Sequence, residues 1–233
     1  MYGGRVAVDG ASLEVRAGEV LGLLGANGAG KSTVFRMLAG VERPDAGEVR
    51  LRGDRVDALT LDARARRGLG YLPQEDTLFR DLTVHDNVAL AVSVSGTGKR
   101  VQALLERVGI GALASRRVPG LSGGERRRLQ IARLLALDPV VLLLDEPFAG
   151  IDPIAIAALQ ELIRGLATDG VGVLLTDHAV RETLATCDRA LLLDAGVVHA
   201  SGTPAEVAAD PHARARYLGA DFVLPALRGS PGV

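Results

Sequence analysis

Residues 25–32 read Gly25-Ala26-Asn27-Gly28-Ala29-Gly30-Lys31-Ser32, and no other segment of the chain is as informative. The segment fits the pattern G-x-x-x-x-G-K-[ST], in which a glycine-rich loop joins a buried strand to a helix. Apolar residues 20–24 precede it and a helical pattern over residues 32–39 follows it. Backbone N–H groups can turn inward around a polyanion only where no β-carbon blocks their approach, which explains the glycines. The sequence therefore predicts a phosphate-binding loop.

The polar side chains of this loop have predicted roles of their own. Lys31 is expected to reach the β- and γ-phosphates of a nucleotide, and the Ser32 hydroxyl to ligate Mg²⁺. The first N–H groups of the helix add partial positive charge. The predicted nucleotide-binding residues are Gly25, Asn27, Gly28, Ala29, Gly30, Lys31, Ser32 and Thr33. The alternative is a tight glycine turn with a solvated Lys31, which the strand-loop-helix context disfavours.

A second motif lies at the end of an apolar strand. Residues 140–144 are Val-Val-Leu-Leu-Leu, and Asp145 and Glu146 follow them directly. An apolar strand alone indicates core, but it gives no reason for adjacent acids at its carboxyl end, where open α/β sheets bind ligands. Asp145 is predicted to hold Mg²⁺ directly or through water, and Glu146 to act as the general base on the attacking water. Together with Lys31, these acids indicate a nucleotide-hydrolysing site.

Short apolar runs alternate with helical patterns, which predicts an α/β fold with a mainly parallel sheet and flanking helices. Strands are expected at residues 20–24, 140–144, 171–176 and 190–193, and helices at residues 32–39, 125–137, 153–168 and 180–186. Residues 6–15 and 48–51 look like half-exposed strands of an antiparallel sheet beside this core.

The whole chain, residues 1–233, is predicted to form one domain. Within it a small helical subdomain is expected at about residues 82–137, because helical patterns at residues 84–94 and 101–108 flank the linker Ser95-Gly96-Thr97-Gly98. The tail at residues 225–233 is expected to be flexible.

The composition of the chain excludes several classes of protein. With 27 basic and 28 acidic residues the formal charge is -1, so there is no general electrostatic attraction to nucleic acid. A single cysteine, Cys187, excludes an internal disulfide and favours a reducing compartment. The longest apolar runs are one strand long, and the first residues show no signal-peptide pattern. A cytoplasmic location is expected.

The segment Leu121-Ser122-Gly123-Gly124-Glu125 precedes a basic helical pattern. Ser122 and Glu125 have the spacing of a capping box, which is one interpretation. A cap alone does not require two glycines at the start of a helix, where better helix formers are available. Bare N–H groups at a helix N-terminus indicate a second anion site.

These motifs resemble those of the ATP-binding-cassette ATPases, whose LSGGE signature lies shortly before the strand that carries the acids. The resemblance covers nearly the whole chain and implies a P-loop NTPase core that binds ATP and Mg²⁺ and hydrolyses ATP. In that family two subunits pair head to tail. ATP on the Lys31 loop of one subunit would then be closed over by Ser122, Gly123 and Gly124 of the other, so that the nucleotide controls dimerisation.

The resemblance assigns roles to four further residues. Gln74, in Gly70-Tyr71-Leu72-Pro73-Gln74, matches the glutamine that reaches Mg²⁺ and the water. Asp152 matches the D-loop residue that crosses to the partner, although it also fits a helix N-cap before Pro153. His178 matches the histidine that contacts the γ-phosphate; a purely structural histidine is the alternative. Tyr2 looks like the aromatic residue that stacks on adenine, yet cassettes usually have a complete strand before it, which leaves that contact open.

Several stretches are similar to the ATPase subunits of lipopolysaccharide export transporters. They are residues 63–75, 121–128, 145–153, 176–184 and 217–222. The opening Met1-Tyr2-Gly3-Gly4 and the length are also similar to ATPases of branched-chain amino-acid importers. The export subgroup fits residues 176–184 and 217–222 better, although the region between Asn87 and Leu121 is shorter than in that subgroup.

Partners are implied by the same resemblance. Separate transmembrane permease subunits are expected to dock near residues 74–79, with Phe79 as an apolar anchor or as an ordinary packing residue. The chain would then lie on the cytoplasmic face of the inner membrane and contact the membrane through these partners alone. A different class, the soluble nucleic-acid-associated cassettes, is suggested by arginines at positions 64, 66, 67 and 126–128. Solvated helix faces explain these arginines, and we expect no nucleic-acid partner.

Overall fold

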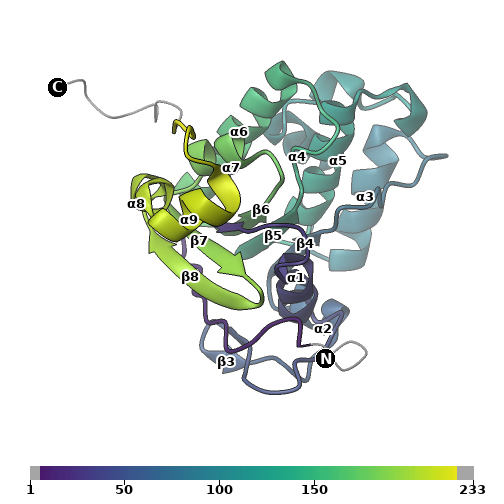
Figure 1. Ribbon diagram of the computed structural model, residues 1–233. Coiled ribbons are helices and arrows are strands. Elements are labelled where there is room, and N and C mark those ends of the chain that lie inside the picture. Colours follow the sequence, from purple (N-terminus) through teal and green to yellow (C-terminus); the bar gives the residue numbers. More distant parts are fainter. Residues whose placement is uncertain (1–5, 225–233) are drawn as a thin grey trace.

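The computed structural model describes residues 6–224. Their centre is a 6-stranded sheet in the order β4-β5-β6-β1-β7-β8 (Figure 1). Its strands are β1 (Val20–Leu24), β4 (Leu69–Leu72), β5 (Val141–Asp145), β6 (Gly172–Thr176), β7 (Arg189–Asp194) and β8 (Val197–Gly202). Strand β8 pairs antiparallel with β7, and the other neighbours in the sheet pair in parallel. The predicted α/β class is confirmed.

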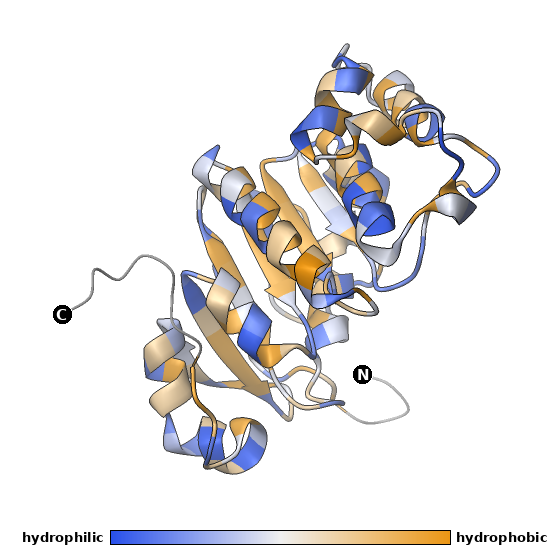
Figure 2. Ribbon diagram, turned by 90° about the horizontal axis from the view of Figure 1, so that it is seen from above, coloured by the Kyte–Doolittle hydropathy of each residue, from blue (hydrophilic) through white to orange (hydrophobic). Residues whose placement is uncertain are grey.

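Helices cover both faces of this sheet, as the view in Figure 2 shows. They are α1 (Lys31–Ala39), α2 (Leu61–Ala65), α3 (Val84–Ser95), α4 (Val101–Arg107), α5 (Gly123–Leu135), α6 (Pro153–Thr168), α7 (Val180–Thr186), α8 (Pro204–Ala209) and α9 (Pro211–Ala213). Short 3-10 turns occur at Gly111–Leu113 and Val118–Gly120, and a π turn at Arg214–Leu218. The bounds predicted for β1, α6 and α7 agree with the structure.

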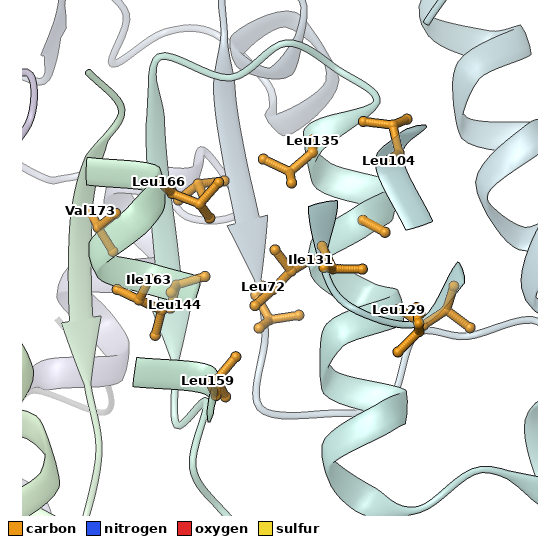
Figure 3. Close-up of a cluster of buried hydrophobic side chains, with 14 of the residues drawn as sticks. Leu72, Leu104, Leu129, Ile131, Leu135, Leu144, Leu159, Ile163, Leu166 and Val173 are labelled. Atoms are coloured by element: carbon orange, nitrogen blue, oxygen red, sulfur yellow. The ribbon is translucent and has the colours of Figure 1, made fainter. Parts of the chain in front are cut away.

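The core strands are buried on both faces, which explains their unbroken apolar sequence. In β5, Leu142 and Leu144 belong to the cluster under α5 and α6, whereas Leu143 belongs to the cluster under α1. This alternation follows from the two-residue period of a strand. Figure 3 draws Leu144 near Ile163 of α6 and Leu72 of β4 near Ile131 of α5, and these residues belong to one buried cluster. Each fully buried leucine stabilises the fold by about 1.5–3 kcal/mol.

Helices α3, α4 and α5 lie beside the sheet on the side of β4 (Figure 1). Helix α3 starts at Thr83, whose hydroxyl accepts the Asp86 N–H, and ends at Gly96 in the left-handed conformation, with φ 66°. Buried Val88 of α3 and Leu105 of α4 share one apolar cluster with the strands. Where a helical subdomain begins and ends stays a prediction, because its core is continuous with that of the sheet.

The expectation for residues 6–15 is wrong, since they form no strand. Val8 and Leu13 pack against the core beside α1, but none of the described strands pairs with residues 6–15. A hydrogen bond from the Asp9 N–H to the Gly196 carbonyl, 2.8 Å long, holds the segment instead. The predicted strand at residues 48–51 is reduced to β2 (Arg50–Leu51), which pairs antiparallel with β3 (Asp54–Arg55).

The interpretation of the arginines as solvated residues is wrong for Arg64. Its side chain is 0% exposed, and its guanidinium donates to the carbonyls of Met37 and Leu38 at 2.6 and 2.7 Å. Those carbonyls lie in the last turn of α1, where a helix has unpaired acceptors and partial negative charge. Arg66 and Arg67 are exposed, as expected.

Two predictions concern residues outside those described, namely the adenine contact of Tyr2 and the tail at residues 225–233. Among residues 6–224, no helix combines the length and the apolar character that a membrane span requires.

Candidate nucleotide-binding site

The predicted phosphate loop joins β1 to α1, and its glycines are of two kinds. A β-carbon on Gly25, where φ is 153°, would lie 2.2 Å from the Leu193 carbonyl oxygen of β7. A β-carbon on Gly28, where φ is 81°, would meet nothing within 4 Å. Gly25 is therefore required for packing against the sheet, whereas Gly28 leaves the backbone open to the cleft.

Lys31 is folded back over this loop. Its Nζ donates to the carbonyls of Gly25 at 2.6 Å and Ala26 at 3.1 Å. Burial disfavours the ammonium and lowers the pKa of Lys31, although Glu146 and Asp145 oppose that shift. Helix α1 has no side-chain cap and no acid in its first turn. Its N-terminal N–H groups and Lys31 together favour an anion at this point.

Asp145 and Glu146 sit at the end of β5, opposite Lys31. Asp145 is buried, and burial together with the neighbouring Glu146 charge raises its pKa to about 6. Glu146 has a φ of 52°, an uncommon conformation for a residue other than glycine. Such strain persists only where the surrounding structure maintains it, and strained residues are concentrated at functional sites.

Glu146 is held between two other predicted site residues. Its Oε1 lies 2.9 Å from Nε2 of His178, and its Oε2 accepts a hydrogen bond of 2.8 Å from Nε2 of Gln74. The three residues follow β5, β6 and β4, whose carboxyl ends lie side by side because these strands pair in parallel. The side chain of Glu146 is 13% exposed and that of His178 is 53% exposed, so the pair opens to solvent.

A cleft connects the loop with these residues. It is lined by Asn27, Gly28, Gly30, Lys31, Ser32 and Thr33 of the loop region, by Ala7, and by Asp145, Glu146 and His178. The Ser32 hydroxyl and the Asp145 carboxylate are hard oxygen donors of the kind that Mg²⁺ prefers. A cation here would also offset the buried charge of Asp145. The donor set therefore fits Mg²⁺.

The structure does not bring the signature segment to this cleft within one chain. Ser122 instead forms the alternative that the sequence suggested, a capping box in which its hydroxyl accepts the Glu125 N–H at 3.3 Å and Glu125 accepts the Ser122 N–H at 2.7 Å. A β-carbon on Gly124 would lie 2.6 Å from Cβ of Ala155 in α6. Close helix packing is thus one reason for Gly124.

Gln74 and Asp152 also lie outside the lining of the cleft. Gln74 lines a separate hollow with Gly123 and Gly150 and reaches the cleft through Glu146. Asp152 caps α6, since its carboxylate accepts the N–H groups of Ile154 and Ala155 at 3.1 and 3.0 Å. Its side chain is exposed, so capping leaves the residue accessible to a partner.

Two buried residues that the sequence reasoning missed support this arrangement. Arg127, which was interpreted as solvated, is 8% exposed and donates to the carbonyls of Glu146 and Pro147, both at 3.1 Å. Asp177 accepts the N–H groups of Phe148 at 2.7 Å and Ala179 at 2.9 Å. Asp177 adjoins His178, a signal that could have identified it. Arg127 differs from its arginine neighbours through burial, which tertiary packing decides.

Comparisons with known proteins agree with this geometry. A family model described as "ABC transporter" matches residues 8–149. The lipopolysaccharide export system ATP-binding protein LptB of Escherichia coli strain K12 is 48% identical over 229 residues, covering 96% of this chain and 95% of the relative.

Solved structures share the fold. An ATP-binding cassette of an ABC transporter in its ADP conformation superposes with a TM-score of 0.84 at 24% identity, covering 94% of each chain. A dimeric post-hydrolysis ATP-binding cassette with ADP and Pi has a TM-score of 0.75 at 25% identity, covering 85% of this chain and 90% of that chain. The chain thus combines a phosphate loop, strand-end acids and a signature helix in a fold shared with nucleotide-bound cassettes, and it belongs to the ABC transporter family as an ATP-binding ATPase subunit.

Proposed function

We propose that this chain is the ATP-hydrolysing subunit of a transporter that exports lipopolysaccharide. The observation that carries the proposal is the 48% identity to a lipopolysaccharide export ATPase across 95% of that relative. It supports export over the two other hypotheses from the sequence, a branched-chain amino-acid importer and a nucleic-acid-associated cassette.

Within one subunit, the loop at residues 25–33 binds the phosphates of ATP through backbone N–H groups and Lys31. Lys31 must leave the carbonyls of Gly25 and Ala26 to do so, and its exchange of neutral acceptors for phosphate oxygens favours ATP binding. Ser32 and Asp145, with Gln74 entering from the edge, would hold Mg²⁺, which neutralises phosphate charge when bound. Tyr2 is proposed as an adenine contact.

Glu146 is the proposed general base. Its carboxylate accepts the proton of the attacking water, and Gln74 and His178 orient it by holding one oxygen each. Because His178 is half exposed and sits at the cleft, its imidazole can turn from Glu146 to the γ-phosphate when ATP arrives. Arg127 supports the strained backbone of Glu146, because its guanidinium donates to the Glu146 carbonyl.

The active centre is proposed to be completed by a second copy in head-to-tail orientation. Ser122, Gly123 and Gly124 are absent from the lining of the cleft in their own chain, which supports their contact with the γ-phosphate in a neighbour's site. The exposed Asp152 is placed to reach across the same interface. Two ATP molecules would then link two subunits, and hydrolysis would release them.

Permease subunits are proposed to dock near residues 74–79, which places the chain on the cytoplasmic face of the inner membrane. Phe79 is 46% exposed, and the Arg133 guanidinium lies 4.9 Å from its ring centroid. The main chain of Phe79 is fixed by Asn87, which donates to its carbonyl and accepts its N–H, both at 3.0 Å. An exposed aromatic ring on a rigid backbone suits a partner helix.

The test is to purify the chain with its membrane partners in lipid and to measure ATP hydrolysis with added lipopolysaccharide or added branched-chain amino acid. We expect stimulation by lipopolysaccharide alone. Stimulation by the amino acid would replace export with import. A steep salt-dependent affinity for nucleic acid, with neither stimulation, would favour the third class.

A further inference from the structure

A second cluster of metal-ligating side chains lies at the β7–β8 edge of the sheet. Strands β4, β5 and β6, which precede Gln74, Glu146 and His178, lie toward the opposite edge. Asp194 at the end of β7, His199 on β8 and His212 on α9 have ligand atoms that all lie within 4.8 Å of one another. Figure 1 shows α9 next to the hairpin of β7 and β8. Side chains from three different elements thus converge on one point.

Local structure directs these three side chains toward each other. The ladder between β7 and β8 pairs Leu192 with Ala200 and Leu193 with Val198, so His199 is the extra residue of a β-bulge. A bulge bends its strand and redirects a side chain, and bulges are maintained where that direction is used. The His199 ring stacks on the His212 ring with centroids 4.3 Å apart and an interplanar angle of 11°.

The position of His212 is fixed as well. Asp210 caps α9 by accepting the Ala213 N–H at 2.8 Å, and His212 Nε2 lies 3.1 Å from Oδ2 of Asp194. The hairpin itself is attached to the phosphate loop, because the Gly196 N–H donates to the Ala29 carbonyl at 2.9 Å. The β7–β8 hairpin and α9, which carry the three side chains, are therefore each held in place by hydrogen bonds of their own.

We propose that Asp194, His199 and His212 bind one divalent transition-metal ion of the Zn²⁺ class, separately from the nucleotide site. Two imidazoles and one carboxylate are a donor set that suits Zn²⁺, with water in the fourth position. Tetrahedral ligands at about 2.1 Å lie about 3.4 Å apart, so the cluster has to contract by rotation of its side chains. His199 is exposed, so its ring can leave the stack on His212 and make that rotation.

Residues near the cluster determine how an ion would bind and which ion is favoured. Arg216 Nε lies 3.7 Å from Oδ2 of Asp194, where it neutralises the carboxylate that a metal would use. Binding must displace this side chain, which is 68% exposed and can move. The sole cysteine, Cys187, is buried and can supply no ligand. The donor set contains two nitrogens, so Mg²⁺, which prefers oxygen, should compete weakly.

The test is a titration of the full chain with Zn²⁺ in excess Mg²⁺ by calorimetry, repeated with Co²⁺ followed by its visible absorption. We expect one ion per chain, and His212→Ala or His199→Ala should weaken binding by about 100-fold or more, because loss of an outer-shell partner alone costs about 10–100-fold. Arg216→Ala should tighten binding. His85→Ala is the matched control, since His85 also faces an aspartate, Asp86 at 3.3 Å, without a second histidine.

A thermal readout separates a real site from loose surface binding. Free Zn²⁺ at about 100 times its Kd should raise the Tm of the parent chain and of His85→Ala by about 5–10 °C, and that of His212→Ala by much less. His178→Ala checks that the ion does not sit at the Glu146 pair and should keep the binding. Unchanged affinity in both His199→Ala and His212→Ala, or loss in His178→Ala, would overturn the proposal.

Discussion

Nε2 of His178 lies 2.9 Å from Oε1 of Glu146, although the two residues belong to loops that follow different strands. The contact arises because β5 and β6 are parallel neighbours, with Asp145 paired to Thr176. Both residues therefore leave the sheet at the same edge. Gln74, which lies outside the cleft lining, donates to the other carboxylate oxygen, so Glu146 is fixed at the point where we propose that it activates a water.

Glu146→Gln should keep ATP binding and lower turnover by about 10²–10⁴-fold, because an amide cannot take the proton from water. Its shape preserves the contacts with Gln74 and His178. Phosphate release measures turnover, and size exclusion with ATP and Mg²⁺ should detect a stabilised dimer. Normal hydrolysis by this variant would refute the role of Glu146 as base.

Lys31→Ala should weaken ATP binding itself. It removes the cation that faces the phosphates and leaves the buried carbonyls of Gly25 and Ala26 without that donor. Loss of one charge-assisted contact corresponds to about 10-fold or more in Kd, from about 1.5–3 kcal/mol. Titration with a fluorescent ATP analogue measures the change. Equal affinity for both chains would contradict the assignment.

Head-to-tail pairing predicts complementation between two inactive variants. Ser122→Asp keeps a helix cap, since aspartate is a good N-cap, but it sets a negative charge against the partner's γ-phosphate. Mixed with Lys31→Ala, it yields heterodimers in which one of the two composite sites has both halves intact.

Hydrolysis should therefore reappear on mixing, while each variant alone stays inactive. The dependence of phosphate release on the mixing ratio is the measurement. A mixture as inactive as its components would exclude the composite site, and full activity of Ser122→Asp alone would show that the signature segment is dispensable.

Asp145 links stability to pH. Its pKa rises from 3.8 unfolded to about 6 folded, so above pH 6 the buried carboxylate destabilises the fold, and this penalty fades as pH falls toward 3.8. Asp145→Asn should thus raise the free energy of unfolding at pH 8, by ~1–2 kcal/mol after allowance for screening by the open cleft.

Urea unfolding without nucleotide or Mg²⁺, at pH 8 and near pH 4, measures this difference. The difference in free energy of unfolding between Asp145→Asn and the parent chain should shrink toward zero at the lower pH. A gain that is independent of pH would show that the charge of Asp145 is not its source.

Gly25→Ala and Gly28→Ala form a matched pair. Both positions have a positive φ, which costs a residue with a β-carbon about 1–2 kcal/mol. At Gly25 the new methyl would also collide with the Leu193 carbonyl, whereas at Gly28 it meets open space. Gly25→Ala should consequently lower Tm by several degrees more than Gly28→Ala does. Equal losses would show that β7 yields to the methyl group.

The local sequence determined the elements whose pattern is self-contained. The glycine loop between β1 and α1, the strand before Asp145 and the capped helix α6 could be predicted because apolar period, caps and turn residues lie within a few residues of one another. Local pattern also identified the glycine loop and the acids Asp145 and Glu146, whereas His178 was assigned through the family resemblance. These residues meet at one cleft because parallel strands bring their carboxyl ends together.

Tertiary structure decided everything that depends on a distant partner. Residues 6–15 have strand-like alternation, but a strand needs a partner strand, and within the described residues 6–224 none pairs with this segment. Arg64 and Arg127 look like their solvated neighbours until carbonyls of other segments surround them. The cluster of Asp194, His199 and His212 depends on a bulge and on the placement of α9. The environment of a side chain is set by packing between distant segments, and the local sequence pattern cannot predict that packing.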